Sequence, residues 1–467
     1  MNLNSPTEAI PESLVADEDG RTHSPSLPAA CRKRHPGRGA LLAIVVGISL
    51  ALALPFVPFV PVSESSVTGA ALMGLASGWL LLGLLLGHAT KVRQRWALLA
   101  ALVFAEGGLL LLTFGAPAHR FLDWVWPPAL LGIAVWMVWS VRWQRGIPKA
   151  VLYPVAVLLV LASVGGGIET VAETADTQSH PVPGRLVDVG GHRLHLRCTG
   201  SGSPTVVFEA GGAVSSSGVG RISAAVARDT RICTYDRAGR GWSDDVATPP
   251  SGKQIAVDLH TALHRSGERG PYVLGGHSFG GLYVRSFAKL YPKEVAGMVL
   301  VDSTAPDRAA HGGEGSTETL HRVAALLSVS ARFGLIRLLN AFIPAGLPAP
   351  YEEEVQANAA TARSLESSLD EYIDAGDSVR DAATLTSIGD KPLVVLTASI
   401  GHDSSWFQAQ NEMLNLSTDS VHRIVPGVDH PGMVASERGA AATAHSIADV
   451  VTAVRTGQRL ASAGGRP

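Results

Sequence analysis

The sequence predicts an α/β domain with a helical cap, preceded by an all-α transmembrane region of about five helices. Mean hydropathy is +0.21 over 467 residues, and the apolar excess lies almost wholly before residue 170. After that point strand-like and helix-like segments alternate, a pattern typical of a largely parallel sheet. One long helical stretch, at about 305–390, interrupts the alternation.

The N-terminal third contains a polar tail and then the apolar runs. Residues 1–39 are rich in Pro, Ser and charge and lack apolar periodicity, which predicts a disordered cytoplasmic tail. We place the membrane region at 40–166, because a bilayer core requires runs of about 20 apolar residues. Five such runs occur, at about 41–62, 66–88, 96–115, 126–141 and 149–166.

Basic residues near the ends of these runs predict the orientation, because Lys and Arg in short loops stay in the cytoplasm. They gather before the first run and in the second and fourth loops: Arg32, Lys33, Arg34, Arg38, Lys91, Arg93, Arg95, Arg142, Arg145 and Lys149. The other two loops, around 61–66 and 116–123, hold only Arg120. We therefore expect an integral, multi-pass membrane protein with an extracytoplasmic α/β domain.

The second half begins with a polar linker at 167–184, and its α/β domain is predicted at 185–456. The strand-like segments, in order, are "RLVDV", "HRLHLRC", "PTVVFEA", "RICTYD", "YVLGG", "GMVLVD", "PLVVLTA" and "SVHRIV". Helical segments are predicted near 253–266, 281–291, 406–414 and 437–454. The helical stretch at 305–390 is predicted as a cap over the carboxyl edge of the sheet, where open α/β sheets bind ligands. Residues 457–467 are expected to form a frayed tail.

The stretch "GGHSFGG", residues 275–281, places Ser278 between a predicted strand and a predicted helix. Such a turn exposes the hydroxyl at the sheet edge and aims the N–H groups of the helix at the same space. In a chain with 50 Gly, a structural turn is the alternative interpretation. The surrounding elements favour a catalytic nucleophile, which then requires a base.

His430, in "VPGVDHPGM", follows the last predicted strand and precedes the final helix, which suits the base. The acid is expected between the two, and Asp403 in "PLVVLTASIGHDSSW" gives the chain order Ser, Asp, His. Asp302, at the end of "LVDS", remains an alternative acid that would equally cap the following turn. His277 and His402 are expected to line the site rather than to act as acid or base.

An oxyanion formed at Ser278 would need two N–H donors. The first expected donor is the backbone N–H of Phe279, directly after the nucleophile. The second is expected in the loop "AGGA" after "TVVFE", with Gly212 as the predicted donor. A tight strand-to-helix turn at these glycines is compatible with that role.

From about residue 184 to 456, the chain resembles enzymes of the α/β-hydrolase fold. The segments "VVFEAGG", "CTYDRAGRGWSD", "GGHSFGG", "MVLVDS", "PLVVLT" and "VPGVDH" follow that family's order and spacing. The resemblance implies an α/β-hydrolase sheet of eight strands with a lid after the sixth, and a triad of Ser278, Asp403 and His430. One departure concerns the oxyanion loop, where many relatives have His-Gly and this chain has Ala210-Gly211.

The expected activity is that of a serine hydrolase, esterase-like or lipase-like, that cleaves a carboxylic ester or related acyl bond through an acyl-enzyme. A proline-iminopeptidase-like peptidase is the enzymatic alternative, because the same triad serves amides. A non-catalytic membrane protein that binds or senses a ligand is the alternative from a different class. The apolar cap segments "VAALLSV" and "LIRLLNAFI" favour a lipid-like acyl substrate, although packing on the core would equally explain them.

The net charge and the motifs of the sequence limit the classes of partner and cofactor that we expect. A net charge of −2 shows no basic excess, so we expect no nucleic acid partner. The sequence lacks metal-ligand spacing, a phosphate loop and a dinucleotide fingerprint, so we expect no metal and no cofactor. The oligomeric state is not predicted.

Cys198 and Cys233 fall near the ends of the second and fourth predicted strands, which the resemblance makes neighbours in the sheet. Outside the cytoplasm a disulfide is permitted. A bridge and two buried thiols both remain open, because sequence does not fix the Cα separation.

Overall fold

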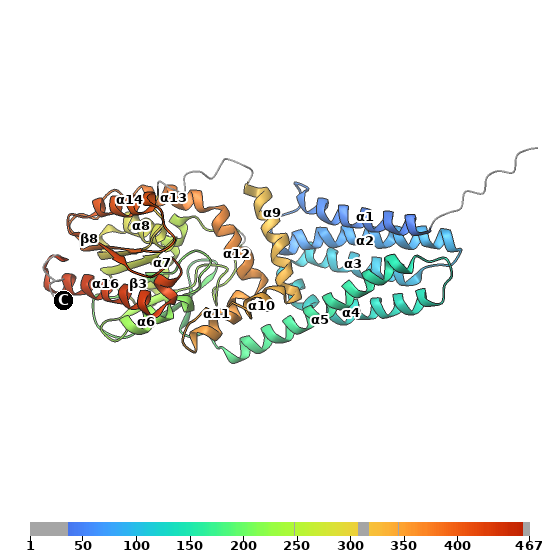
Figure 1. Ribbon diagram of the computed structural model, residues 1–467, viewed down its shortest axis with the longest axis horizontal. Coiled ribbons are helices and arrows are strands. Elements are labelled where there is room, and N and C mark those ends of the chain that lie inside the picture. The colour runs from blue at the N-terminus through green and yellow to red at the C-terminus, as the bar shows by residue number, and fades with distance from the viewer. Residues whose placement is uncertain (1–35, 247, 307–316, 344, 461–467) are drawn as a thin grey trace, which may run out of the picture. The chain divides into compact units, whose positions relative to one another are not determined.

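The computed structural model describes residues 36–460 except 247, 307–316 and 344. Among these, five helices are long and apolar enough to cross a membrane, as predicted. They are α1 (Pro36–Ala53, continued by the 3-10 turn η1, Leu54–Phe56), α2 (Glu64–Thr90), α3 (Arg95–Phe114), α4 (Ala116–Arg142) and α5 (Lys149–Ser179) (Figure 1). Most of the predicted tail, residues 1–35, lies outside the described residues.

Two of these helices extend beyond their apolar runs. The predicted loop around 116–123 forms the start of α4. The helix α5 continues to Ser179, so most of the polar linker predicted at 167–184 is helical. Polar side chains in the extension of α5 find partners. The Thr170 hydroxyl donates to the carbonyl oxygen of Asp123, and the buried Glu169 pairs with Arg337 of the cap. These polar groups have hydrogen-bond or ion-pair partners within the protein. The helix α5 can therefore continue beyond the end of its apolar run.

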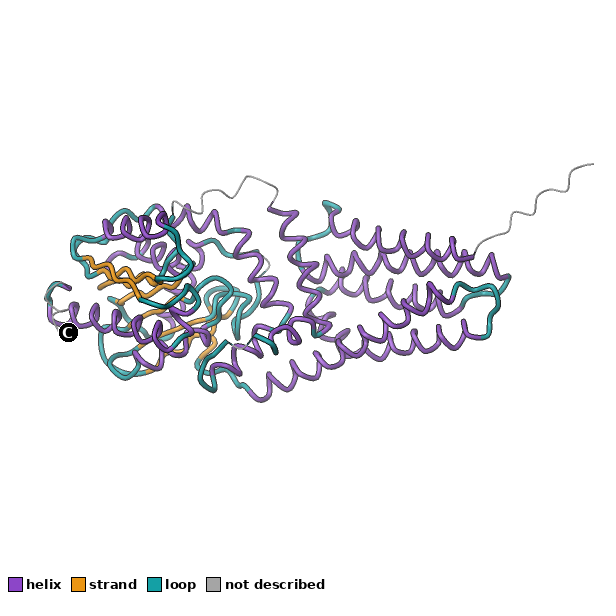
Figure 2. Tube along the Cα trace, viewed as in Figure 1, coloured by secondary structure: helices purple, strands orange, loops and turns teal. Residues whose placement is uncertain are grey.

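The α/β domain contains one sheet of eight strands, as the resemblance implied. The strands are β1 (Arg185–Asp188), β2 (Arg193–Thr199), β3 (Val206–Glu209), β4 (Ile232–Tyr235), β5 (Tyr272–His277), β6 (Val295–Val301), β7 (Leu393–Ala398) and β8 (Ser420–Val425). The strands are drawn in orange in Figure 2, and their order in the sheet is β1-β2-β4-β3-β5-β6-β7-β8. The β1–β2 and β2–β4 pairs are antiparallel and the other pairs are parallel. The carboxyl ends of β5, β6 and β7 therefore meet at one edge.

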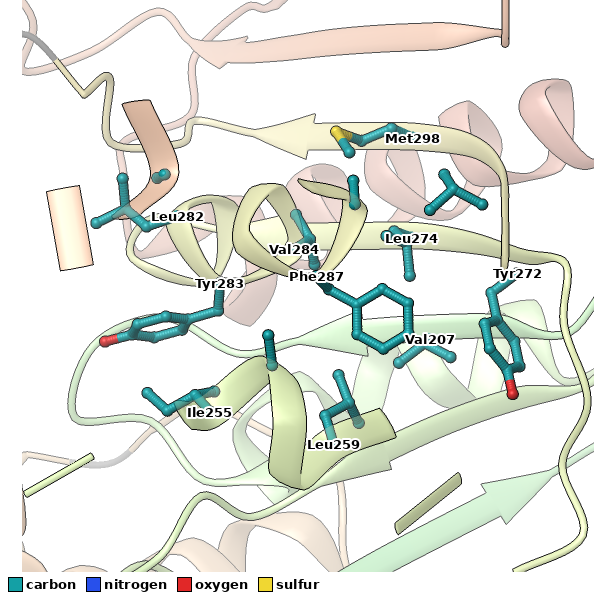
Figure 3. Packing of buried hydrophobic residues seen from close by; sticks show 14 of the residues in the cluster. Val207, Ile255, Leu259, Tyr272, Leu274, Leu282, Tyr283, Val284, Phe287 and Met298 are labelled. Atoms are coloured by element: carbon teal, nitrogen blue, oxygen red, sulfur yellow. The ribbon is translucent and has the colours of Figure 1, made fainter. Parts of the chain in front are cut away.

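Helices cover both faces of this sheet. One face packs against α7 (Gly252–Arg265) and α8 (Gly280–Leu290), and the other against α6 (Gly220–Val226) and α16 (Glu437–Thr456). Side chains alternate between the two cores, as the period of a strand requires. In β6, Met298 joins the α7–α8 side and Val299 the α16 side. Figure 3 shows Met298 and Leu274 on the side where Phe287 of α8 packs.

Between β6 and β7 lies the predicted cap. It comprises α9 (Thr317–Ser328), η4 (Val329–Phe333), α10 (Leu335–Asn340), α11 (Tyr351–Ala359), α12 (Ala362–Ile373) and α13 (Ala375–Ala383). The remaining elements are η2 (Ser216–Val219), η3 (Pro292–Glu294), α14 (Ser404–Glu412), η5 (Met413–Leu416) and α15 (Gly432–Ala435). The predicted tail at 457–467 is ordered at its start, because Leu460 is buried and donates its N–H to Asp419.

Candidate active site

The strand β5 delivers Ser278 to a sharp turn, and α8 begins two residues later. Ser278 has φ of +54°, a conformation that costs a non-glycine residue about 1–3 kcal/mol. The neighbouring glycines allow close crossing of the backbone. A Cβ on Gly276 would lie 2.5 Å from the carbonyl oxygen of Gly280, and one on Gly280 would lie 2.4 Å from that of Glu209. The predicted strand-turn-helix geometry around Ser278 is therefore present.

His430 lies in the loop between β8 and α15, as predicted. Its carbonyl oxygen accepts a hydrogen bond from Nε2–H of His277 at 3.1 Å, and the two imidazole rings are 4.7 Å apart. His277 directly precedes Ser278, so this bond holds the His430 loop beside the turn. Burial, followed by repulsion from His430, lowers the pKa of His277 to about 3, so its imidazole stays neutral. The prediction that His277 lines the site is supported, and the structure adds a positioning contact.

The carboxylate that meets His430 belongs to Asp302, at the end of β6. Its Oδ2 accepts from Nδ1–H of His430 at 2.6 Å and from Nε2–H of His402 at 2.7 Å. Its Oδ1 accepts from Trp406 Nε1–H at 2.9 Å and from the N–H of Ala398 at 3.2 Å. Burial of Asp302 opposes its ionisation, but these hydrogen bonds, the one from His430 foremost, hold its pKa below the usual value. Asp302 is thus a buried, charged acceptor.

The expected pairing of Asp403 with His430 is wrong. Asp403 is the N-cap of α14, and its Oδ1 accepts from the backbone N–H of Trp406 at 2.9 Å and from the Ser405 hydroxyl at 2.6 Å. A carboxylate at a helix start is stabilised by the free N–H groups there. The signal that identifies Asp302 instead is its place at the end of β6, because β6 adjoins β5, the strand that leads into Ser278.

The loop after β3 lies against the turn. A Cβ on Gly211 would lie 3.2 Å from Cβ of Ser278, and one on Gly212 would lie 3.1 Å from the phenyl ring of Phe279. The structure therefore places Gly212 beside the phenyl ring of Phe279. The oxyanion role of their two N–H groups stays a prediction.

A buried charge cluster, which no motif in the sequence predicts, connects this loop to the cap. Glu371 of α12 accepts from the N–H of Ala213 at 2.9 Å and from the Tyr283 hydroxyl at 2.7 Å. It also forms ion pairs with the buried Arg237 and Arg240. Burial opposes ionisation of Glu371, but the two guanidinium groups outweigh it and lower its pKa. The cap helix is thereby joined to the predicted oxyanion loop.

Asp302, His402 and His430 also have the chemistry of metal ligands, and one atom of each lies within 4.8 Å of the others. Both imidazoles, however, direct an N–H at the same carboxylate oxygen. A metal would require ring lone pairs at that point instead of protons. The arrangement is that of a hydrogen-bonded acid and two imidazoles.

Known proteins resemble parts of this chain. An uncharacterized protein of Schizosaccharomyces pombe is 29% identical over 221 residues, which cover 41% of this chain and 39% of that protein. An uncharacterized vacuolar membrane protein of Saccharomyces cerevisiae is 38% identical over 74 residues, 16% of this chain and 12% of its own. The chain therefore spans less than half the length of either relative.

Among solved structures, a thermophilic esterase from Thermogutta terrifontis has 19% sequence identity and a TM-score of 0.42, over 57% of this chain and 97% of its own. A sequence model described as "Alpha/beta hydrolase family" matches residues 198–445. That match covers β3 to β8, the Ser278 turn, Asp302 and His430. Because it extends over more than half of the sequence, the chain belongs to the alpha/beta hydrolase family.

Proposed function

We propose that the protein is a membrane-anchored serine hydrolase that cleaves a carboxylic ester or related acyl bond. The observation that carries this proposal is the 2.6 Å hydrogen bond from His430 to Asp302, in a loop that His277 holds beside Ser278. A buried acceptor fixes the tautomer of an imidazole and stabilises its protonated form. With both effects, His430 can act as the base that accepts the proton of a serine nucleophile.

In the proposed reaction, Nε2 of His430 removes the Ser278 proton as Oγ attacks the carbonyl carbon. The N–H groups of Phe279 and Gly212 donate to the oxyanion. The imidazolium then protonates the leaving alcohol as the acyl-enzyme forms. Water, deprotonated by His430, attacks the acyl carbon, and Ser278 leaves with the proton. Asp302 stays ionised throughout, consistent with its lowered pKa.

Exposed apolar residues on the cap support a lipid-like acyl substrate. No residue of α10 is buried, and Leu338 is 58% exposed. Phe342 and Ile343, just after α10, are 77% and 72% exposed. Packing on the core therefore does not account for this segment. Apolar side chains beside predicted membrane helices suit contact with a lipid surface, from which such a substrate would come.

Labelling with a fluorophosphonate tests the proposal. The intact protein should react covalently at Ser278, and Ser278→Ala should remove both the label and the turnover of short-chain and long-chain esters. Asp302→Asn should slow labelling without preventing folding. Unchanged turnover in Ser278→Ala would overturn the mechanism.

We also propose that the α/β domain is extracytoplasmic. The alternation of basic loops supports this orientation, and so does the disulfide between Cys198 and Cys233, because such bonds persist mainly outside the cytoplasm. A C-terminal alkaline phosphatase fusion should be active and a C-terminal green fluorescent protein fusion dark in a bacterial host. The reverse pattern would refute the orientation.

A further inference from the structure

The five long helices surround an apolar cavity that the proposed reaction does not use. Its volume is about 530 Å³, within the range of small-molecule pockets, and it is lined by residues of α1 to α5 and by α9 and η4 of the cap. Along α2 the lining runs from Thr68 to Leu82, and along α5 from Val155 to Thr170. At 1.5 Å per residue each stretch spans about 20 Å. The cavity is therefore long and parallel to the helices.

The cavity has one polar end. Thr68, His119 and Asp123 lie near the starts of α2 and α4, and Arg332 of η4 completes the lining there. His119 is 5% exposed, and its Nε2 has no hydrogen-bond partner among the residues described. The hydroxyl of Thr68 likewise lacks a partner within the described chain. A buried polar atom without a partner is unfavourable, so these two groups favour a ligand with hydrogen-bonding atoms.

Charge at this end selects the kind of ligand. All three nitrogens of the Arg332 guanidinium are occupied, Nε and one terminal nitrogen by Glu64 and the other terminal nitrogen by Asp123. The charge of Arg332 is therefore already balanced by two carboxylates, and an anionic headgroup at this end would also meet Glu64 and Asp123. The unpaired imidazole nitrogen and hydroxyl, by contrast, suit an uncharged group that both donates and accepts.

We propose that this cavity binds a single-chain amphiphile with an uncharged, hydroxyl-bearing headgroup. The alkyl chain lies along the bundle between α2 and α5, and the headgroup bonds His119 and Thr68 beneath the cap. Arg332 and Phe333 of η4 line the cavity, so the cap forms part of the binding site. The site is separate from Ser278, and its occupancy does not depend on hydrolysis.

A photoactivatable 1-O-alkylglycerol, with a diazirine in its chain, tests the site on the full chain in phosphatidylcholine vesicles. The ether bond resists hydrolysis, so the result is independent of the proposed activity. Labelled peptides should map to the cavity faces of α2, α4 and α5. Unlabelled 1-O-hexadecylglycerol should compete, and palmitate at pH 8 should compete at least about tenfold more weakly. Labels on lipid-facing residues alone would overturn the site, and equal competition by palmitate would overturn the headgroup assignment.

Two variants with matched controls sharpen the test. Ala162→Phe fills the cavity and should abolish the label, whereas Ala150→Phe, at an exposed position of the same helix, should retain it. His119→Leu should raise the probe concentration that gives half-maximal labelling about tenfold. His119→Gln, which keeps a polar side chain, should recover most of the lost affinity. Equal labelling in Ala162→Phe and Ala150→Phe would contradict the proposal. The map on the unsubstituted chain decides the matter should a variant fold poorly.

Discussion

At the scale of single residues, the choice between two carboxylates decides the candidate site. Asp302→Asn removes the charge that faces His430 and allows the wrong imidazole tautomer. We expect kcat to fall by about 10⁴-fold, as for the equivalent change in other triads. Asp403→Asn should leave kcat unchanged, because Asn caps a helix about as well as Asp. Ester turnover of both purified variants, with circular dichroism as the folding control, checks this, and an equal loss in Asp403→Asn would restore the sequence-based assignment.

His321 gives a second prediction at this scale. It lies between Asp370 and Asp374, at 2.6 Å and 3.1 Å, and these hydrogen bonds raise its pKa to about 10. Because the folded pKa exceeds the unfolded value of about 6.5, the stabilisation is complete below about pH 6.5 and is lost as the pH rises through 10. We expect a loss of about 1 kcal/mol, allowing for solvent screening.

Thermal unfolding of the full chain between pH 6.5 and pH 10.5 measures this effect. The midpoint should fall with rising pH in the native protein, and the fall should be smaller in His321→Gln, which cannot carry the charge. Identical pH profiles for the two proteins would show that His321 does not tie α9 to α12.

At the scale of elements, the disulfide joins β2 to β4. The two cysteines are register partners in this antiparallel pair and are 35 residues apart in the chain. Closing a loop of that length is worth about 4 kcal/mol in the chain-entropy account. The double variant Cys198→Ser with Cys233→Ser should therefore unfold at a clearly lower temperature. Alkylation of the denatured protein should add two further groups when reductant is present, and identical masses with and without reductant would rule the bridge out.

At the scale of the whole molecule, Arg332 joins the cap to two of the long helices. Its side chain pairs with Glu64 of α2 and Asp123 of α4, and burial alone would disfavour its charge, but these carboxylates raise its pKa. Arg332→Met leaves two partly buried carboxylates without their cation, a change that costs about 3–5 kcal/mol when a buried pair is broken. Hydrogen exchange across α9 and α10 should increase in the full-length variant.

Arg380→Met is the matched control for that experiment. Arg380 is 73% exposed and pairs with Asp377 on the cap surface, where an ion pair contributes about 0–1 kcal/mol. Exchange in α9 and α10 should stay at the native level in this variant. Similar exchange in both variants would mean that Arg332 does not hold the cap to the helices.

Local patterns in the sequence determined much of this architecture. Runs of apolar residues predict the five long helices, and alternating segments predict all eight strands, because these periods are fixed by backbone geometry. The position of Ser278 on a turn follows from the glycines on either side. His430 is likewise located by its place after the last strand.

Only the tertiary structure decided which groups meet. Asp302 lies 128 residues from His430, and the order of the strands, with β6 beside β5, brings them together. The continuation of α5 and the polar end of the cavity likewise depend on cap residues far along the chain. Hydrogen bonds and ion pairs between residues so far apart in the chain produce no periodic pattern in the sequence. They depend on how elements pack, which periodicity and turn residues do not specify.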